Sequence, residues 1–176
     1  RATHRAEYDQ AEELLSKLTQ LVEEMDTVLK DHRSVYYAGY VEDAHKEYVE
    51  AHATLAFVRQ SSLPTPQELG VGPAPYLNGL AEAVGELRRS ILDALRRDDL
   101  SQCETLLEVM DEVYSILVSM DFPEAVTSGL RRSTDMARGI LERTRGDLTV
   151  ALRQGRLEKR LAQLQDSLTD GAEGPP

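Results

Sequence analysis

The sequence predicts an all-α protein, a bundle of about six to seven helices that ends in a long C-terminal helix. Apolar residues recur three and four positions apart through almost the whole chain, and no stretch alternates with a sustained period of two. Aromatic residues make up only 5% and Trp is absent, so Leu, Ala and Val must build the core. The 176 residues fit one domain over residues 1–168, followed by a disordered tail over 169–176.

The first predicted helix runs from about Tyr8 to Lys30, and a second is expected over about residues 35–59. The second repeats apolar and aromatic residues at mixed four- and three-residue steps. We place the break between the two helices at about residues 31–34. The apolar stripe of the first helix consists of Ala11, Leu14, Leu15, Leu18, Leu21, Val22 and Met25.

The main loop is predicted at residues 61–75, which contain four prolines and two glycines. Within it, Thr65 and Glu68 have the spacing of a capping box, and Gly70 suits the end of a single helical turn. A third full helix is then expected over about residues 75–97. Its apolar stripe consists of Leu77, Leu80, Val84, Leu87, Ile91 and Leu95.

A fourth helix is predicted to open at a second capping box, formed by Ser101 and Glu104, and to reach about Met120. Asp121 is the predicted N-cap of the last segment, which continues as one long helix, or as two nearly in line, to about Leu168. About 40 helical residues span about 60 Å, which is longer than a compact domain of this size needs. We therefore expect part of this helix to pack against another subunit in a homo-oligomer.

The net charge of -11 is combined with only four Lys among the 20 basic residues, a composition suited to high salt and therefore to a halophilic source. The sign reverses over residues 127–161, where nine basic residues face four acidic ones, a net of +5 that leaves -16 for the remainder. The sequence contains no run of about 18 apolar residues, the length needed to span a membrane. The charged start of the chain is unlike a signal peptide. We expect a cytoplasmic protein with no membrane partner.

Three carboxylates, Asp43, Glu47 and Glu50, would share one stripe of the second predicted helix at positions i, i+4 and i+7. Like charges at such spacings cost a few tenths of a kcal/mol per pair, so the stripe requires a solvated face, a basic partner or a bound cation. Glu47 falls beside the apolar seam of its helix, where solvation explains it poorly. Glu47 and Glu50 are therefore the candidate ligands of Mg²⁺ (or Mn²⁺).

Further carboxylates, Glu104 and Glu108, are four residues apart on the fourth predicted helix. Glu104 has an alternative role in the capping box. If the second and fourth helices pack side by side, the four glutamates could hold two Mg²⁺ ions and activate water for phosphodiester hydrolysis, with Glu47, Glu50 and Glu108 as catalytic residues. A di-iron bundle needs two Glu-x-x-His motifs, and only Glu42 with His45 forms one, which excludes that class.

Four arginines of the basic C-terminal segment are candidates for contact with nucleic-acid phosphates: Arg131, Arg132, Arg138 and Arg145. The alternative is a solvated helix face with ion pairs four residues apart, such as Arg138 with Glu142.

The chain resembles the translin–Trax family over most of its length. The resemblance is carried by RATHRAEYDQAEELL, YYAGYVEDAHKEYVEAHATLAFV, ELGVGPAPYLNGLAEAVGELRRSIL and LRRSTDMARGILERTRGDL, and is greatest to the archaeal members. It implies a translin-like fold of about seven helices and a closed octameric shell around a nucleic-acid-binding interior, with the start of this chain resembling the end of the family's basic first helix. Translin subunits bind single-stranded RNA and DNA, whereas Trax subunits are Mg²⁺-dependent endoribonucleases.

The Trax site draws two glutamates from a Glu-aromatic-Val-Glu-Ala run, which residues 47–51 match. It also draws an Asp and a Glu four residues apart from a later helix. Alignment on Val113 and Tyr114 places Ser101 and Thr105 at those positions, so Glu104 and Glu108 become the substitutes. The resemblance therefore implies a Trax-type endoribonuclease acting on RNA inside a homo-oligomeric shell. The alternatives are a non-catalytic translin-like protein that binds single-stranded RNA or DNA, and a purely structural helical oligomer.

Overall fold

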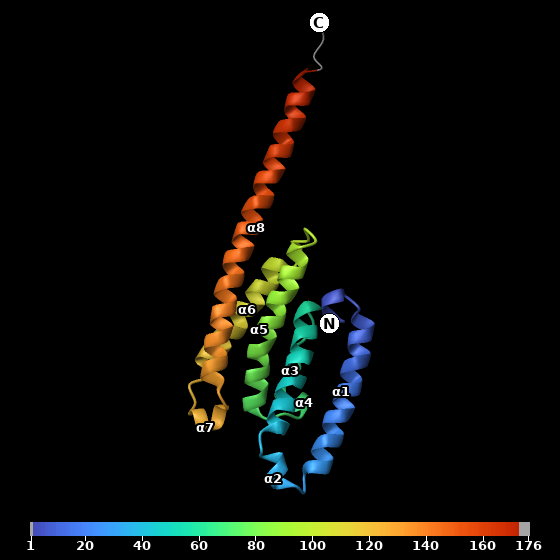
Figure 1. Ribbon diagram of the computed structural model, residues 1–176, viewed down its shortest axis with the longest axis vertical. Coiled ribbons are helices and arrows are strands. Elements are labelled where there is room, and N and C mark those ends of the chain that lie inside the picture. The colour runs from blue at the N-terminus through green and yellow to red at the C-terminus, as the bar shows by residue number, and fades with distance from the viewer. Residues whose placement is uncertain (1, 173–176) are drawn as a thin grey trace.

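The protein is a bundle of roughly antiparallel helices in a computed structural model that describes residues 2–172, and their side chains apart from those of 166 and 168–172 (Figure 1). Within this range there is no strand, which confirms the all-α prediction. A 3₁₀ turn, η1 (Thr3–Arg5), precedes eight α-helices in the described chain. These are α1 (Tyr8–Leu29), α2 (Arg33–Tyr36), α3 (Tyr40–Val58), α4 (Pro66–Leu69), α5 (Pro73–Leu95), α6 (Cys103–Ser119), α7 (Glu124–Thr127) and α8 (Leu130–Ala172).

Helix α5 is the centre of the bundle, because it packs against α3 on one side and against α6 and α8 on the other. Helix α1 lies outside α3, farthest from α8 (Figure 1). The core is built mainly of aliphatic side chains, as the composition predicts, and α5 supplies Leu80, Ala83, Val84, Leu87 and Ile91. Helices α3 and α6 both pack mainly on α5 and make only slight contact with each other.

The second predicted helix is divided in two. The single turn of α2 ends at Tyr36, with Tyr37 as its C-cap. Gly39 has φ +96°, a left-handed conformation that suits glycine, and is the N-cap of α3, which begins at Tyr40. The reorientation leaves Tyr37 and Tyr40 exposed rather than on the apolar seam.

Of the two predicted capping boxes, one forms. In α4 the Glu68 N–H donates to Thr65 Oγ1 at 3.2 Å and the Thr65 N–H donates to Glu68 Oε2 at 2.7 Å, which confirms the first box. The second is wrong, because α6 begins two residues later, at Cys103. Ser101 instead donates from its N–H and hydroxyl to Asp99 Oδ1, at 3.0 and 2.6 Å.

The last turn before the long helix also differs from expectation. Asp121 is not an N-cap; Pro123 occupies that position of α7, a four-residue helix that ends at Ser128 in the left-handed conformation.

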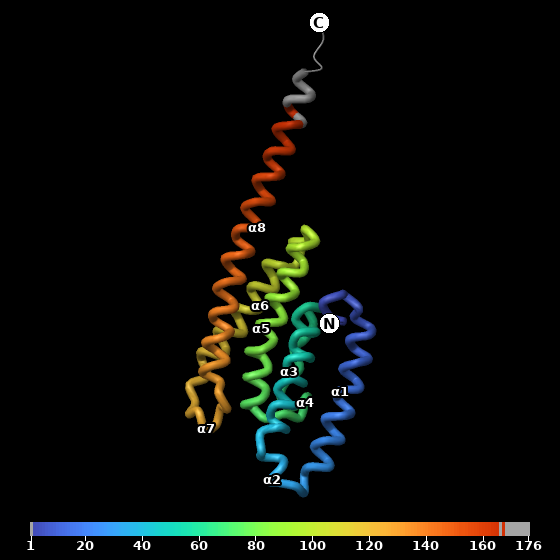
Figure 2. Tube along the Cα trace, in the orientation of Figure 1, coloured from blue at the N-terminus to red at the C-terminus, as the bar shows by residue number. Residues whose placement is uncertain are grey.

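Helix α8 is one continuous helix of 43 residues, about 65 Å long at 1.5 Å per residue. It passes Gly139, Gly146 and Gly155 without a break and extends well beyond the rest of the bundle (Figures 1 and 2). The long C-terminal helix is thus confirmed, although it ends at Ala172 rather than near Leu168. Residues 173–176 of the predicted tail lie outside the described residues. No helix in the described part of the chain is long and apolar enough to cross a membrane.

Candidate functional site

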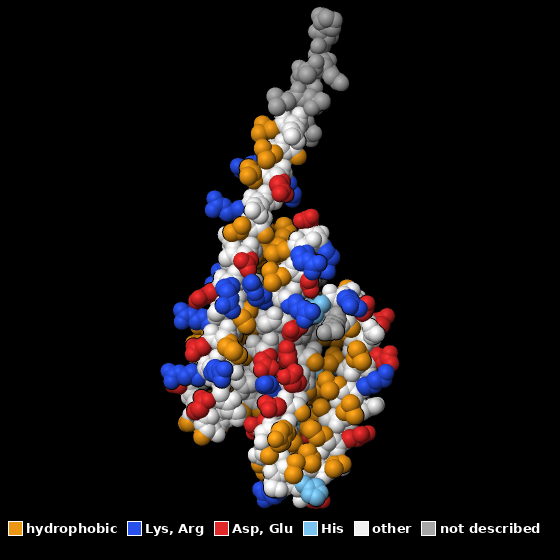
Figure 3. All heavy atoms as spheres, viewed as in Figure 1, with side chains coloured by type: hydrophobic (Ala, Val, Ile, Leu, Met, Phe, Trp, Pro, Cys, Tyr) orange, Lys and Arg blue, Asp and Glu red, His pale blue; other side chains and the backbone are white. Residues whose placement is uncertain are grey.

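Carboxylates from α3 and α5 converge on one face of the bundle. Oxygen atoms of Glu47, Glu50 and Glu82 all lie within 4.8 Å of one another. Glu47 is exposed, whereas Glu50 and Glu82 are partly buried. Figure 3 shows acidic side chains gathered at the middle of this face, between the apolar side chains of α1 and the basic side chains of α8. We call Glu47, Glu50, Glu82 and the neighbouring Glu86 the acidic cluster.

Close packing of the two helices brings the cluster together. At Gly79 of α5, an added Cβ would lie 2.7 Å from the carbonyl oxygen of Lys46 and 2.7 Å from Cβ of Val49, so only glycine fits there. Glu82 lies one turn after Gly79 and faces the same side of α5. The helices therefore meet at the level where α3 presents Glu47 and Glu50.

One basic side chain partly compensates the cluster. Lys46 Nζ lies 2.9 Å from Glu82 Oε1 and 3.8 Å from Asp43 Oδ1. The hydrogen bond with Glu82 raises the pKa of the Lys46 ammonium, so it stays charged at neutral pH. Asp43 is exposed at the edge of the site and interacts with it only through its ion pair with Lys46.

The charge on Glu50 remains poorly compensated. Burial raises the pKa of its carboxyl to about 7, and the negative charges of Glu47, Glu82 and Glu86 add to the rise, against a smaller opposing effect of Lys46. A solvated face, one of the three explanations of the stripe, therefore does not account for Glu50. A basic partner is present, but it pairs with Glu82.

His4 anchors the fourth carboxylate of the cluster. Its nearly buried imidazole has Nε2 2.5 Å from Glu86 Oε2 and Nδ1 3.0 Å from the Ser90 hydroxyl oxygen. Both partners lie on α5, one turn apart. The short N-terminal 3₁₀ turn is thereby tied to the edge of the acidic cluster.

Two hollows adjoin the acidic cluster. The first, a cavity of about 300 Å³, lies on the α1 side and is lined by Glu47, Glu50 and Glu86 together with apolar side chains. The second, of about 280 Å³, lies on the α8 side and is lined by Lys46, Glu82 and Arg132, among others. The cluster thus has an apolar neighbourhood on one side and, on the other, a hollow where Lys46 and Arg132 lie among the carboxylates of Glu42, Asp43 and Glu82.

A buried asparagine fixes the basic side of the site. Asn78 of α5 donates from Nδ2 to the carbonyl oxygens of Ala74 and Thr127, each at 2.9 Å, and accepts from the Ser133 hydroxyl at 2.7 Å. These bonds hold the first turn of α8 against α5. Arg132, the neighbour of Ser133, then lies at the second hollow with Glu82.

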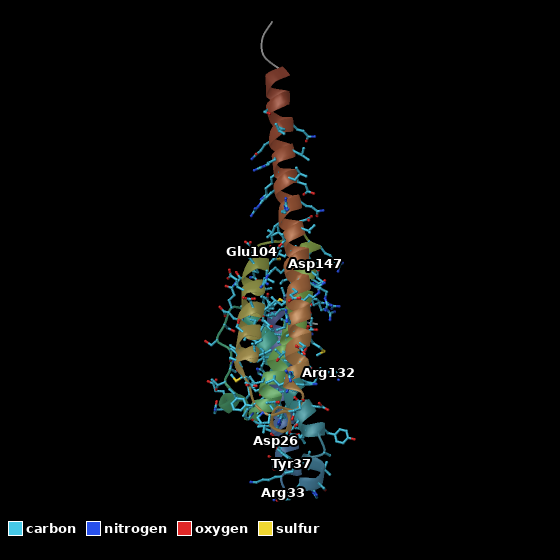
Figure 4. The ribbon with its side chains drawn as sticks, turned by 90° about the vertical axis from the view of Figure 1, so that its left-hand side faces the viewer. Asp26, Arg33, Tyr37, Glu104, Arg132 and Asp147 are labelled. Atoms are coloured by element: carbon cyan, nitrogen blue, oxygen red, sulfur yellow. The ribbon has the colours of Figure 1, made fainter. Side chains whose placement is uncertain are left out.

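The structure does not bring Glu104 and Glu108 together with Glu47 and Glu50, although the sequence predicted that the four would form one site. Both are exposed on α6, which packs mainly on α5 and α8 and touches α3 only slightly. Figure 4 shows Glu104 near the upper end of α6, while Arg132 lies lower and on the other side of α8. The second and fourth predicted helices touch only slightly, since both pack mainly on α5.

The four predicted phosphate-binding arginines have different surroundings. Arg138 pairs with Glu142 at 2.9 Å, as the alternative interpretation predicted, and Arg145 pairs with Asp111 at 2.6 Å. Arg131 is exposed near the start of α8. Arg132 alone of the four lines the hollow beside the acidic cluster.

Sequence reasoning missed Glu82, Glu86 and His4. Glu82 and Glu86 are four residues apart on a helix later than α3, which is the spacing that the resemblance implies for the second half of a Trax site. They lie in the segment YLNGLAEAVGELRR, which carries part of that resemblance. The alignment on Val113 and Tyr114 instead directed attention to α6, whereas the carboxylates beside Glu47 and Glu50 come from α5. His4 had no signal in the sequence.

Comparison with known proteins places the chain. No family model matches it. An uncharacterised protein of Methanocaldococcus jannaschii is 30% identical over 162 residues, which cover 92% of this chain and 72% of that protein. AfC3PO, solved alone and in complex with duplex RNA, is 36% identical, with TM-scores of 0.79 and 0.80, over 89% of this chain and 80% of AfC3PO.

A more distant structure, that of apo-NeC3PO, shares the fold at 23% identity, with a TM-score of 0.76 over 85% of this chain and 78% of NeC3PO. The C3PO proteins are of the translin–Trax type. The resemblance seen in the sequence is confirmed, and the chain belongs to the translin–Trax family.

Proposed function

We propose that this protein is an RNA-binding, Mg²⁺-dependent endoribonuclease that works inside a homo-oligomeric shell. The observation that carries the proposal is the convergence of Glu47, Glu50 and Glu82, with oxygen atoms within 4.8 Å of one another. The relative AfC3PO has been solved with duplex RNA, which supports nucleic acid as the ligand.

The residues present fit a hard divalent cation. The cluster offers only carboxylate oxygens, the ligand type that Mg²⁺ and Mn²⁺ prefer. Burial raises the pKa of Glu50 to about 7 and the neighbouring carboxylates add to the rise, so a bound cation would favour the charged form of Glu50. Glu47, Glu50 and Glu82 would hold the ion, and His4 would keep Glu86 directed at it.

When bound, Mg²⁺ would offset the charge of a phosphodiester and make a coordinated water acidic enough to supply hydroxide at neutral pH. The protein's own groups bind and orient the RNA. Lys46 and Arg132 lie on the α8 side of the cluster and would contact phosphates next to the one attacked. Glu104 and Glu108 have no part in this scheme.

Enclosure in a shell is supported by α8, which extends beyond the bundle and leaves large apolar side chains exposed. The family resemblance implies an octamer. A shell also suits a protein of net charge -11, because confinement keeps RNA near the site where screening would weaken purely ionic contacts.

A second function is favoured by one observation. The Lys46–Glu82 ion pair supplies a cation to the cluster from within the chain, as a non-catalytic site would. In that case the protein is a translin-like module that binds single-stranded RNA or DNA without cleaving it.

Cleavage of a labelled single-stranded RNA tests the proposal. The wild type should cut with Mg²⁺ or Mn²⁺ and not with EDTA. Glu47→Gln/Glu50→Gln should lose at least about 100-fold of the rate, because the charged ligands are removed while their shape is kept. Glu104→Gln/Glu108→Gln is the matched control and should cut like the wild type. RNA binding with no cleavage by the wild type would favour the second function.

A further inference from the structure

The cavity on the α1 side of the acidic cluster has one apolar wall and one polar border. Helix α1 and Ala51 of α3 provide the apolar wall, and the polar border includes Glu47, Glu50, Glu86 and His4. Figure 3 shows the corresponding band of apolar side chains beside the acidic patch. At about 300 Å³ the cavity has the size of a small-ligand site. Its α1 residues are Ala11, Leu14, Leu15 and Leu18.

One polar side chain of this wall has no partner. Thr54 is 5% exposed, and its hydroxyl forms no hydrogen bond although it is buried. A helical threonine usually donates to the carbonyl four residues earlier, here that of Glu50, and that bond is not formed. Leaving a buried hydroxyl unsatisfied costs about 1–3 kcal/mol, so a valine here would favour folding. A hydrogen bond from this hydroxyl to a bound ligand would explain why a threonine occupies the position.

We propose that this cavity binds one unpaired nucleobase of the RNA whose phosphate is held at the acidic cluster. The inference deepens the proposed function and rests on it for the position of the phosphate. The charged side chains of the cavity wall are Glu47, Glu50 and Glu86, with no Lys or Arg among them. A phosphate can therefore stay at a metal ion on the acidic cluster but gains nothing inside the cavity, so the part of a nucleotide that can enter it is the uncharged base. A base offers flat apolar faces to the leucines of α1 and hydrogen-bonding edges to Thr54.

The pocket makes cleavage depend on local unpairing. A base held in a duplex is stacked and paired, and it reaches a pocket only by swinging out, which costs a few kcal/mol. The cavity would therefore favour RNA with an unpaired nucleotide at the cleaved position.

Calorimetric titration with Mn²⁺ present tests the pocket, with adenosine monophosphate and ribose 5-phosphate as the probes. The two probes share the phosphate and the sugar, and only the first has a base. Wild type should bind adenosine monophosphate at least about tenfold more tightly. Thr54→Val should weaken that binding about two- to tenfold, leave ribose 5-phosphate unchanged, and raise or keep the melting temperature.

The control pair lies on α1. Leu14→Ser alters the cavity wall, whereas Leu21→Ser changes a leucine of similar exposure, 61% against 52%, two turns away and outside the cavity. Of these two variants, only Leu14→Ser should weaken the binding of adenosine monophosphate. The pocket proposal would be wrong if the two probes bound equally well. It would also be wrong if neither Thr54→Val nor Leu14→Ser changed the binding of adenosine monophosphate. Neither result would contradict the metal site. If Mn²⁺ itself does not bind, the proposed function is wrong. The pocket can then be tested separately, by measuring the binding of adenosine, which has no phosphate, to the wild type, Thr54→Val and Leu14→Ser.

Discussion

Gly79 of α5 and Val49 of α3 are in direct contact, so close that a Cβ on residue 79 would lie 2.7 Å from Cβ of Val49. The carbonyl oxygen of Lys46 is equally near. Val49 is fully buried, and it lies between Glu47 and Glu50 in the sequence. Glu82 follows Gly79 by one helical turn. The closest approach of the two helices is therefore also the place where their carboxylates meet.

Gly79→Ala should destabilise the fold and open the site. The new methyl group must push backbone against backbone, which costs about 1–3 kcal/mol. Gly139→Ala is the control, because residue 139 is also helical but has nothing within 4 Å of an added Cβ, and it should gain up to about 1 kcal/mol. Urea denaturation measures both. A Gly79→Ala variant as stable as Gly139→Ala would show that the contact can relax freely.

Glu50 should make the stability fall as the pH rises. Its carboxyl has a pKa of about 7 in the folded protein against an ordinary 4.5, so the folded state holds the proton more tightly. The resulting stabilisation is complete below about pH 4.5 and disappears as the pH passes about 7. Because Glu50 is partly exposed, we expect a loss of about 1–2 kcal/mol rather than the full value of the shift.

The difference between wild type and Glu50→Gln isolates this effect from other titrating groups. The free energy of unfolding of Glu50→Gln, relative to the wild type, should increase between pH 5 and pH 8. At pH 8, added Mg²⁺ should stabilise the wild type and have a smaller effect on the variant. Parallel pH curves for the two proteins would contradict the raised pKa.

The sequence predicted the helices well where periodicity is long, as in α1, α5 and α8, and located Glu47 and Glu50 from their position beside an apolar seam. It could not predict which later helix packs on α3. Both α5 and α6 carry glutamates four residues apart, and the decision depends on Gly79, whose missing side chain acts only through a neighbour 30 residues away in the sequence. Lys46 likewise gains its role only when α5 brings Glu82 to it.

Arg132 should contribute more to RNA binding than Arg138. Arg132 lies at the hollow that contains Lys46 and Glu82, and no ion pair with it is found among the described residues. Arg138 is already paired with Glu142. We expect Arg132→Ala to weaken binding of single-stranded RNA about tenfold and to reduce the slope of log K against log salt by about 1. Fluorescence anisotropy at several salt concentrations measures both quantities, with Arg138→Ala as the control. Equal losses in the two variants would indicate a diffuse basic surface instead.

The far part of α8 should hold subunits together. Beyond the bundle its exposed apolar residues follow heptad-like steps of seven, four and three, at Val150, Leu157, Leu161 and Leu164. Leu157→Asp/Leu161→Asp should give a smaller species in light scattering with little loss of helical content, because neither side chain belongs to the buried core. Leu157→Met/Leu161→Met preserves the apolar stripe and should keep the wild-type mass. If the aspartate variant also keeps that mass, the subunits associate through another surface, and the exposed stripe on α1 at Leu14, Leu21 and Val28 becomes the next to test.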